Sequence, residues 1–126
     1  DDATLNAGVS RFRADPRALA RLAYDADLTG EISVPTVTLH ALHDPTVTFA
    51  AEAAYRETVE RAGRSQWLVQ AATDESDHSK LEDAGYITSL NALEAWMNGG
   101  ERPDPNGFQA ACEALAIGPC KFVAQP

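Results

Sequence analysis

Residues 36–45 read TVTLHALHDP, and this segment carries the clearest structural signal in the chain. β-Branched residues are frequent in its first part, which is typical of a strand. Residues 36–42 include no Asp, Glu, Lys or Arg, so both faces of the predicted strand suit a covered environment. The triplet His43–Pro45 is turn-like, and we therefore expect the strand to stop there, with Asp44 just beyond its carboxyl end.

The segments that follow predict a strand–helix–strand–helix unit. Residues 49–62 predict a helix whose charged side chains, Glu52 among them, lie on a solvated face. Residues 66–72 predict a second strand, followed by a polar loop over residues 73–82. A further helix should then carry an apolar stripe of Tyr86, Leu90, Leu93 and Met97. Two strands joined by one helix of this length should be parallel, with a right-handed crossover, so the expected fold class is α/β.

Two flanking segments complete the predicted organisation. Residues 1–30 are expected to form a helical lead-in, in which Asp15 caps a helix and Pro16 takes its first position. Residues 31–98 hold the α/β unit, and residues 99–126 form a C-terminal tail with a short helix of its own.

The only two cysteines, Cys112 and Cys120, lie close together in this tail. Two cysteines alone do not make a zinc site. Their closeness, and the lack of any other cysteine, favour a local disulfide, which implies an oxidising compartment. The expected localisation is therefore secreted or periplasmic. Two free thiols, one of them in the core, are the alternative.

The chain is acidic, with ten Lys and Arg against nineteen Asp and Glu and a formal net charge of −9. This balance argues against nucleic acid or an anionic membrane as the partner, because binding to phosphates needs a basic face. No run of 18 apolar residues is present that could form a transmembrane helix. The N-terminus is acidic and polar, unlike a signal peptide, so we expect a mature, trimmed or excised chain.

Two polar loops follow the two predicted strands, and each holds a candidate catalytic side chain. Asp44 follows the first strand, and His78 lies in the loop after the second. The carboxyl ends of neighbouring parallel strands meet at one edge of a sheet, where ligands bind in open α/β folds. A carboxylate beside an imidazole fixes the ring's tautomer and stabilises the imidazolium that forms when the ring takes a proton from a nucleophile. The pair therefore predicts triad-type chemistry.

Both loops resemble parts of the serine α/β-hydrolases. Residues 28–47 resemble the seventh strand and acid loop of that family, and residues 73–78 resemble the loop after the eighth strand, which carries the histidine. The chain order, acid before histidine, agrees with the family's order Ser…Asp…His. The resemblance covers residues 28–98. It implies the C-terminal half of a hydrolase sheet, with Asp44 as the triad acid and His78 as the general base.

The chain departs from the family pattern at three places. Asp77 precedes the histidine where the family often has Gly, and the acid loop has Ala41-Leu42-His43 where a Gly is frequent. No Gly-x-Ser-x-Gly elbow occurs anywhere in the 126 residues. The resemblance therefore implies a nucleophile from a second polypeptide or from a missing N-terminal half. Because two strands make a poor independent sheet, we expect a large apolar face that this partner buries.

Other assignments of the same loops remain open. Asp74 or Asp77 could supply the acid, although Asp77 is adjacent to His78 and would need an awkward turn to reach it. Histidine and aspartate are also zinc ligands, and the candidates for such a site are His40, His43, Asp44 and His78. Their spacing matches no defined zinc pattern, so we expect no metal and no cofactor. His40 is expected to pack beneath the acid loop instead.

The leading functional expectation is a segment of an esterase-like serine hydrolase. In this interpretation Asp44 and His78 act with a serine of the partner segment on a small-molecule acyl substrate. The alternative is a non-catalytic, hydrolase-like binding or structural subunit, suggested by the missing elbow. A flavodoxin-like regulator is a weaker third hypothesis, because the chain predicts too few strands for that fold. The substrate-binding residues and the substrate itself cannot be named from the sequence.

Overall fold

The computed structural model describes residues 1–125. Over this range it contains five α-helices and three strands. In chain order these are α1 (Asp2–Gly8), α2 (Pro16–Ala26), β1 (Thr36–Ala41), α3 (Ala50–Arg61), β2 (Leu68–Thr73), α4 (Asp83–Met97), α5 (Phe108–Leu115) and β3 (Phe122–Val123). Short 3-10 helices precede β2 and α5, at Ser65–Trp67 and Pro105–Gly107. None of the helices within this range has the length and apolar character needed to cross a membrane.

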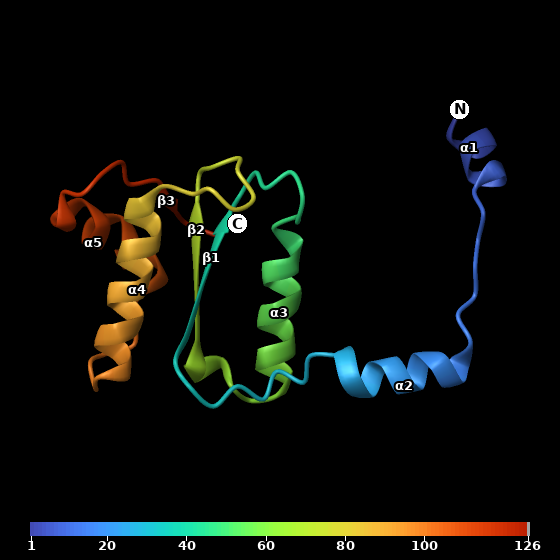
Figure 1. The fold of residues 1–126 in the computed structure, drawn as a ribbon, viewed down its shortest axis with the longest axis horizontal. Helices are drawn as coiled ribbons and strands as arrows, with labels where there is room; N and C mark the ends of the chain where they lie inside the picture. The colour runs from blue at the N-terminus through green and yellow to red at the C-terminus, as the bar shows by residue number, and fades with distance from the viewer. Residues whose placement is uncertain (126) are drawn as a thin grey trace.

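The three strands form one mixed sheet in the order β1-β2-β3. β1 and β2 are parallel, in a register that sets Thr36 opposite Leu68 and Ala41 opposite Thr73. The expected strand–helix–strand–helix unit is therefore present, and α3 and α4 lie on opposite sides of the sheet (Figure 1). β3 adds a short antiparallel edge, in which Phe122 pairs with Thr73. The sequence did not predict β3, because two residues are too few to show a period.

The hydrophobic core lies on the α4 and α5 side of β2. Every residue of β2 is buried. The buried cluster on this side consists of Val69, Ala71, Ala84, Phe108, Cys112 and Phe122. The expected disulfide joins Cys112 to Cys120, and residues 1–125 contain no free cysteine. The disulfide links α5 to the segment just before β3, so it closes the C-terminal part of the core.

Helix α4 buries small side chains and leaves several of its large apolar side chains exposed, although Trp96 packs against the core. Its buried residues are Ala84, Gly85, Thr88 and Ser89. Its most exposed large apolar residues are Tyr86, Ile87, Leu90 and Met97, which we call the α4 patch. Much of the apolar stripe predicted from the sequence therefore lies on the outer side of the helix. Small side chains let α4 approach β1 closely, and this contact is one of the main ones in the fold.

The N-terminal arm, residues 1–29, contains both α1 and α2 and extends away from the sheet (Figure 1). Asp15 caps α2 as predicted, with its Oδ1 atom accepting hydrogen bonds from the backbone N–H groups of Arg17 and Ala18. No residue of the arm is buried. The arm meets the body at Gly30, which is buried with φ +76° and lies so close to α3 that a Cβ would clash with the Thr58 carbonyl.

Candidate functional site

The acid loop, residues 42–49, begins where β1 ends. Two backbone hydrogen bonds tie it to the chain at the end of β2. Leu42 N–H donates to the Thr73 carbonyl at 2.9 Å, and His43 N–H donates to the Glu75 carbonyl at 3.0 Å. These two bonds hold the two polar loops side by side at the carboxyl edge of the parallel pair.

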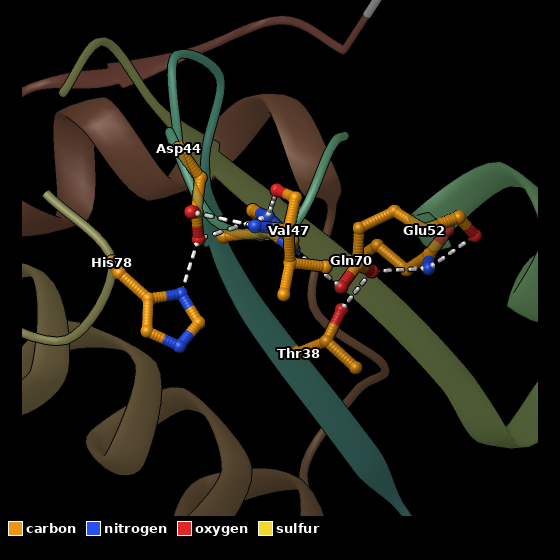
Figure 2. Close-up of polar contacts among 7 residues, drawn as sticks. Thr38, Asp44, Val47, Glu52, Gln70 and His78 are labelled. Carbon is orange, nitrogen blue, oxygen red and sulfur yellow. Dashed lines mark hydrogen bonds and ion pairs between the residues drawn. The ribbon is translucent and has the colours of Figure 1, made fainter. Parts of the chain in front are cut away.

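Asp44 uses its two carboxylate oxygens for different partners. Oδ1 accepts hydrogen bonds from the backbone N–H groups of Thr46 at 2.7 Å and Val47 at 2.9 Å, which closes the turn. Oδ2 lies 2.8 Å from Nδ1 of His78, which belongs to the His loop, residues 74–82 (Figure 2). The side chain of Asp44 is only 4% exposed. The carboxylate is therefore held in one orientation by three donors.

His78 offers one ring nitrogen to Asp44 and leaves the other open. Because the carboxylate can only accept, we assign the ring hydrogen to Nδ1, which makes Nε2 an acceptor. No hydrogen bond joins Nε2 to any group of residues 1–125. Figure 2 shows this nitrogen directed away from Asp44. The side chain is 48% exposed, so Nε2 is accessible to a group from outside this chain.

The surroundings of Asp44 favour its ionised form. Burial of the carboxyl opposes ionisation, but the hydrogen bonds from Val47 N–H, the His78 ring and Thr46 N–H outweigh it. Together they lower the pKa of Asp44 from 3.8 to about 2. Asp44 is consequently a carboxylate throughout the neutral range, as a group that orients an imidazole must be.

A cavity of about 260 Å³ adjoins the pair. Its walls are formed by Leu39, His40, Ala41, Asp44, Val47, His78 and Leu81. Most of this lining is apolar, and none of it is Ser, Thr or Cys. A second cavity, of about 250 Å³, is lined by residues from the other end of β2, including Leu68, together with Arg56 and Arg102. We assign the candidate site to the first cavity, because it contains the oriented imidazole.

A polar cluster lies beneath the acid loop, on the α3 side of the sheet. Glu52, predicted to be solvated, instead faces the sheet and accepts hydrogen bonds from the Thr38 hydroxyl at 2.7 Å and from the Gln70 amide (Figure 2). His40 lies between Glu52 and the acid loop, so the expectation that it packs beneath this loop is confirmed. The prediction for Glu52 is wrong because a helix crossing over a sheet turns one side of its first turn toward the strands, whatever its charge pattern.

The other predicted site residues lie apart from His78. Asp74 pairs with His43 at 3.0 Å, and both side chains are mostly exposed. Asp77 is exposed and makes no hydrogen bond to His78. Of the three candidate acids, Asp44 is therefore the one that the structure brings to the imidazole. Within residues 1–125, no three His, Cys, Asp or Glu side chains are grouped as metal ligands.

Glu52 is the site residue that sequence reasoning missed, although a signal for it exists. Thr38 and His40 are two residues apart on β1, so they share one face of a strand that is expected to be covered. Polar groups on a covered face need hydrogen-bonding partners. Glu52, in the first turn of the following helix, is the acceptor that the topology brings over them.

Comparison with known proteins identified no relative of this chain. No protein-family model, curated protein or solved structure matches this chain. The chemistry open to the site follows from its own groups: a fixed carboxylate, an imidazole with one accessible nitrogen and an adjoining apolar cavity. Such a pair can accept a proton and return it.

Proposed function

We propose that this chain is the acid- and histidine-bearing segment of a serine hydrolase that cleaves carboxylic esters or related acyl compounds. One observation carries the proposal: Asp44 Oδ2 and His78 Nδ1 lie 2.8 Å apart, on loops that follow adjacent parallel strands. This is the arrangement in which a carboxylate orients a general base. The C-terminal half of an α/β-hydrolase sheet, over residues 31–98, is the architecture proposed with it.

In the proposed reaction, a serine from another polypeptide, or from a segment preceding this chain, approaches Nε2 of His78. Nε2 takes the hydroxyl proton as the serine oxygen attacks the acyl carbonyl, and Asp44 stabilises the imidazolium. His78 then gives the proton to the leaving group, which departs as an alcohol and leaves an acyl-serine. Water repeats the sequence with His78 as base, and releases the carboxylic acid and the free serine.

Two surfaces of this chain support a partner that completes the sheet. β1 is an edge strand in the observed order, so one row of its backbone groups has no strand beside it within residues 1–125. The α4 patch is a second exposed apolar surface. A partner carrying the nucleophile can pair with β1 and cover apolar side chains of this kind.

We also propose that the protein acts outside the cytoplasm. The support for this is the Cys112–Cys120 disulfide, because such bonds persist in oxidising compartments and are rare in reducing ones. The intact mass of the purified protein, measured with and without reductant after alkylation, tests whether the bond is present in the cell-derived material.

The missing elbow favours one second candidate, a hydrolase-like subunit without catalysis. No Gly-x-Ser-x-Gly sequence occurs in the 126 residues. In such a subunit, Asp44 and His78 would stabilise the two loops and bind no reacting group. A fluorophosphonate probe, which labels activated serines, separates the candidates: the hydrolase assembly is labelled at one serine of the partner segment, and the non-catalytic assembly is not labelled.

The decisive experiment is His78→Ala in the assembled protein, assayed with p-nitrophenyl esters. Loss of a triad member should lower kcat by about 10³-fold or more. His43→Ala is the matched control, because His43 is also paired with an aspartate but lies on the exposed side of the same edge. Equal activity in His78→Ala and His43→Ala would reject the assignment of His78 as the general base.

A further inference from the structure

His40 connects helix α3 to the acid loop. Its Nδ1 atom lies 3.2 Å from Oε1 of Glu52, and its Nε2 atom lies 3.1 Å from the carbonyl oxygen of Val47. Nε2 is also 3.5 Å from Oδ2 of Asp44. The ring is 12% exposed, and Phe49 packs edge-on against it at a centroid distance of 5.6 Å. His40 therefore touches the acid loop at Val47, which helps to close the turn, and at Asp44 itself.

The hydrogen bonds of this cluster fix which groups donate. Glu52 receives the Thr38 hydroxyl and the Gln70 amide on Oε2, so its carboxylate acts as an acceptor there (Figure 2). Oε1 faces Nδ1 of His40, and the Val47 carbonyl faces Nε2. Both ring nitrogens of His40 thus face acceptors. The ring lies against the carboxylate of Glu52 and also faces Asp44.

The geometry points to His40, held by Glu52, as a positioning residue for the Asp44–His78 pair. This inference rests on the proposed function, because the reaction it serves is the one proposed above. His40 holds the carbonyl of Val47, and the N–H group of the same residue holds Oδ1 of Asp44. The cluster therefore sets the loop conformation in which Oδ2 is free to receive His78.

A covered polar network under an active loop could also be part of the core alone, and the two roles predict different results. A core role predicts loss of stability with an unchanged pair in the molecules that remain folded. A positioning role predicts that Asp44 loses its orientation while the fold persists, so that kcat falls and KM stays nearly constant. A displacement of about 1 Å at such a site can lower the rate by about 100-fold.

The test uses the assembled protein and a spectroscopic signature that does not depend on turnover. The hydrogen between Nδ1 of His78 and the Asp44 carboxylate should give a far-downfield proton NMR resonance. His40→Ala should abolish or broaden this resonance and lower kcat by about 10- to 100-fold. His40→Gln should restore much of both, because its amide nitrogen can still donate to the Val47 carbonyl. His43→Ala, the matched control, should change neither.

Each outcome decides the inference. If folded His40→Ala keeps the resonance and full kcat, His40 has no positioning role. If His40→Ala does not fold, Glu52→Gln replaces it and should weaken the resonance in a folded protein. Should both variants unfold, the cluster is structural and the inference is rejected. If the wild-type assembly has no hydrolase activity, the proposed function fails, and the resonance alone decides whether His40 orients the pair.

Discussion

The two faces of the sheet are covered by helices of opposite character. On the α4 face, apolar strand residues, Val69 and Ala71 among them, pack into a core that α5 and the disulfide complete. On the α3 face, Thr38, His40 and Gln70 meet the carboxylate of Glu52. Burial of apolar area on the α4 face stabilises the fold. The hydrogen bonds on the α3 face contribute little net free energy, but they fix the positions of the groups that make them. The candidate site adjoins the polar face.

The largest effect on activity is expected from Asp44→Asn, which changes the carboxylate at the point where the polar face meets the acid loop. The asparagine oxygen can keep the bonds from Thr46 and Val47, and its amide then donates to Nδ1 of His78. The imidazole is held in the wrong tautomer, so kcat should fall by about 10⁴-fold while the protein stays folded at a somewhat lower melting temperature. Steady-state kinetics and a melting curve measure both, and Asp74→Asn serves as the exposed control. Unchanged kcat in Asp44→Asn would reject the assignment of Asp44 as the triad acid.

The apolar face is tested by Phe108→Ala. Phe108 is 2% exposed and lies against Phe122 at a centroid distance of 5.3 Å. Truncating a buried phenyl ring should lower the free energy of unfolding by about 3–5 kcal/mol, measured by urea denaturation. The reason is loss of buried area together with a cavity that the neighbours fill only in part. A cost below about 1 kcal/mol would mean that this face is not the main source of stability.

Removal of the disulfide by Cys112→Ala with Cys120→Ala should have the next largest effect. The two residues are 8 apart in sequence, and a closed loop of this size contributes about 2–3 kcal/mol through the entropy of the unfolded chain. The variant should unfold at lower urea concentration than the oxidised wild type. Reductant should lower the wild-type midpoint and leave the variant unaffected. Because both cysteines lie on the apolar side, kcat measured below the unfolding range should stay the same.

Thr38→Val sharpens the comparison, because it places an apolar residue of similar shape on the polar face. The variant loses a hydrogen bond of 2.7 Å to Glu52 and leaves one acceptor less satisfied. We expect a cost of about 1.5 kcal/mol, at the low end for a bond to a charged group, since Gln70 still donates to the same oxygen. Val37→Ala, the neighbouring position on the apolar face, is the matched control. A gain in stability for Thr38→Val would show that the polar cluster does not stabilise the fold and serves only to position the acid loop.

The last prediction concerns the dependence of stability on pH. The pKa of Asp44 is lowered from 3.8 to about 2, so its interactions stabilise the fold fully above pH 4 or so. This contribution should be lost as the pH falls from the ordinary value towards about 2. Urea midpoints between pH 5 and 2 should therefore fall more steeply for the wild type than for Asp44→Asn. Parallel curves for the two proteins would contradict the assignment of the shift to Asp44.

The parts of the fold that follow local rules were predictable from sequence. β1, β2 and the helices after them each show a period or a capping residue, and the contact of Asp44 with His78 follows from two parallel strands ending at one edge. The remainder depends on packing between elements. The side of α4 that meets the sheet is chosen by close approach, which favours small residues over the large stripe. Glu52 was misplaced for a similar reason, because its environment is set by Thr38 and His40 on a strand rather than by its own helix.

The arm before Gly30 is open to a protease along its whole length, because none of its residues is buried. Arg11, Arg13, Arg17 and Arg21 all precede this glycine, in a segment without buried residues. Trypsin should therefore trim the arm stepwise, and Lys80→Gln would remove the exposed trypsin site of the His loop so that this loop is not cut at the same time. The trimmed remainder would be a smaller scaffold on which the proposed partner segment could be tested by reconstitution, with recovery of turnover followed by titration.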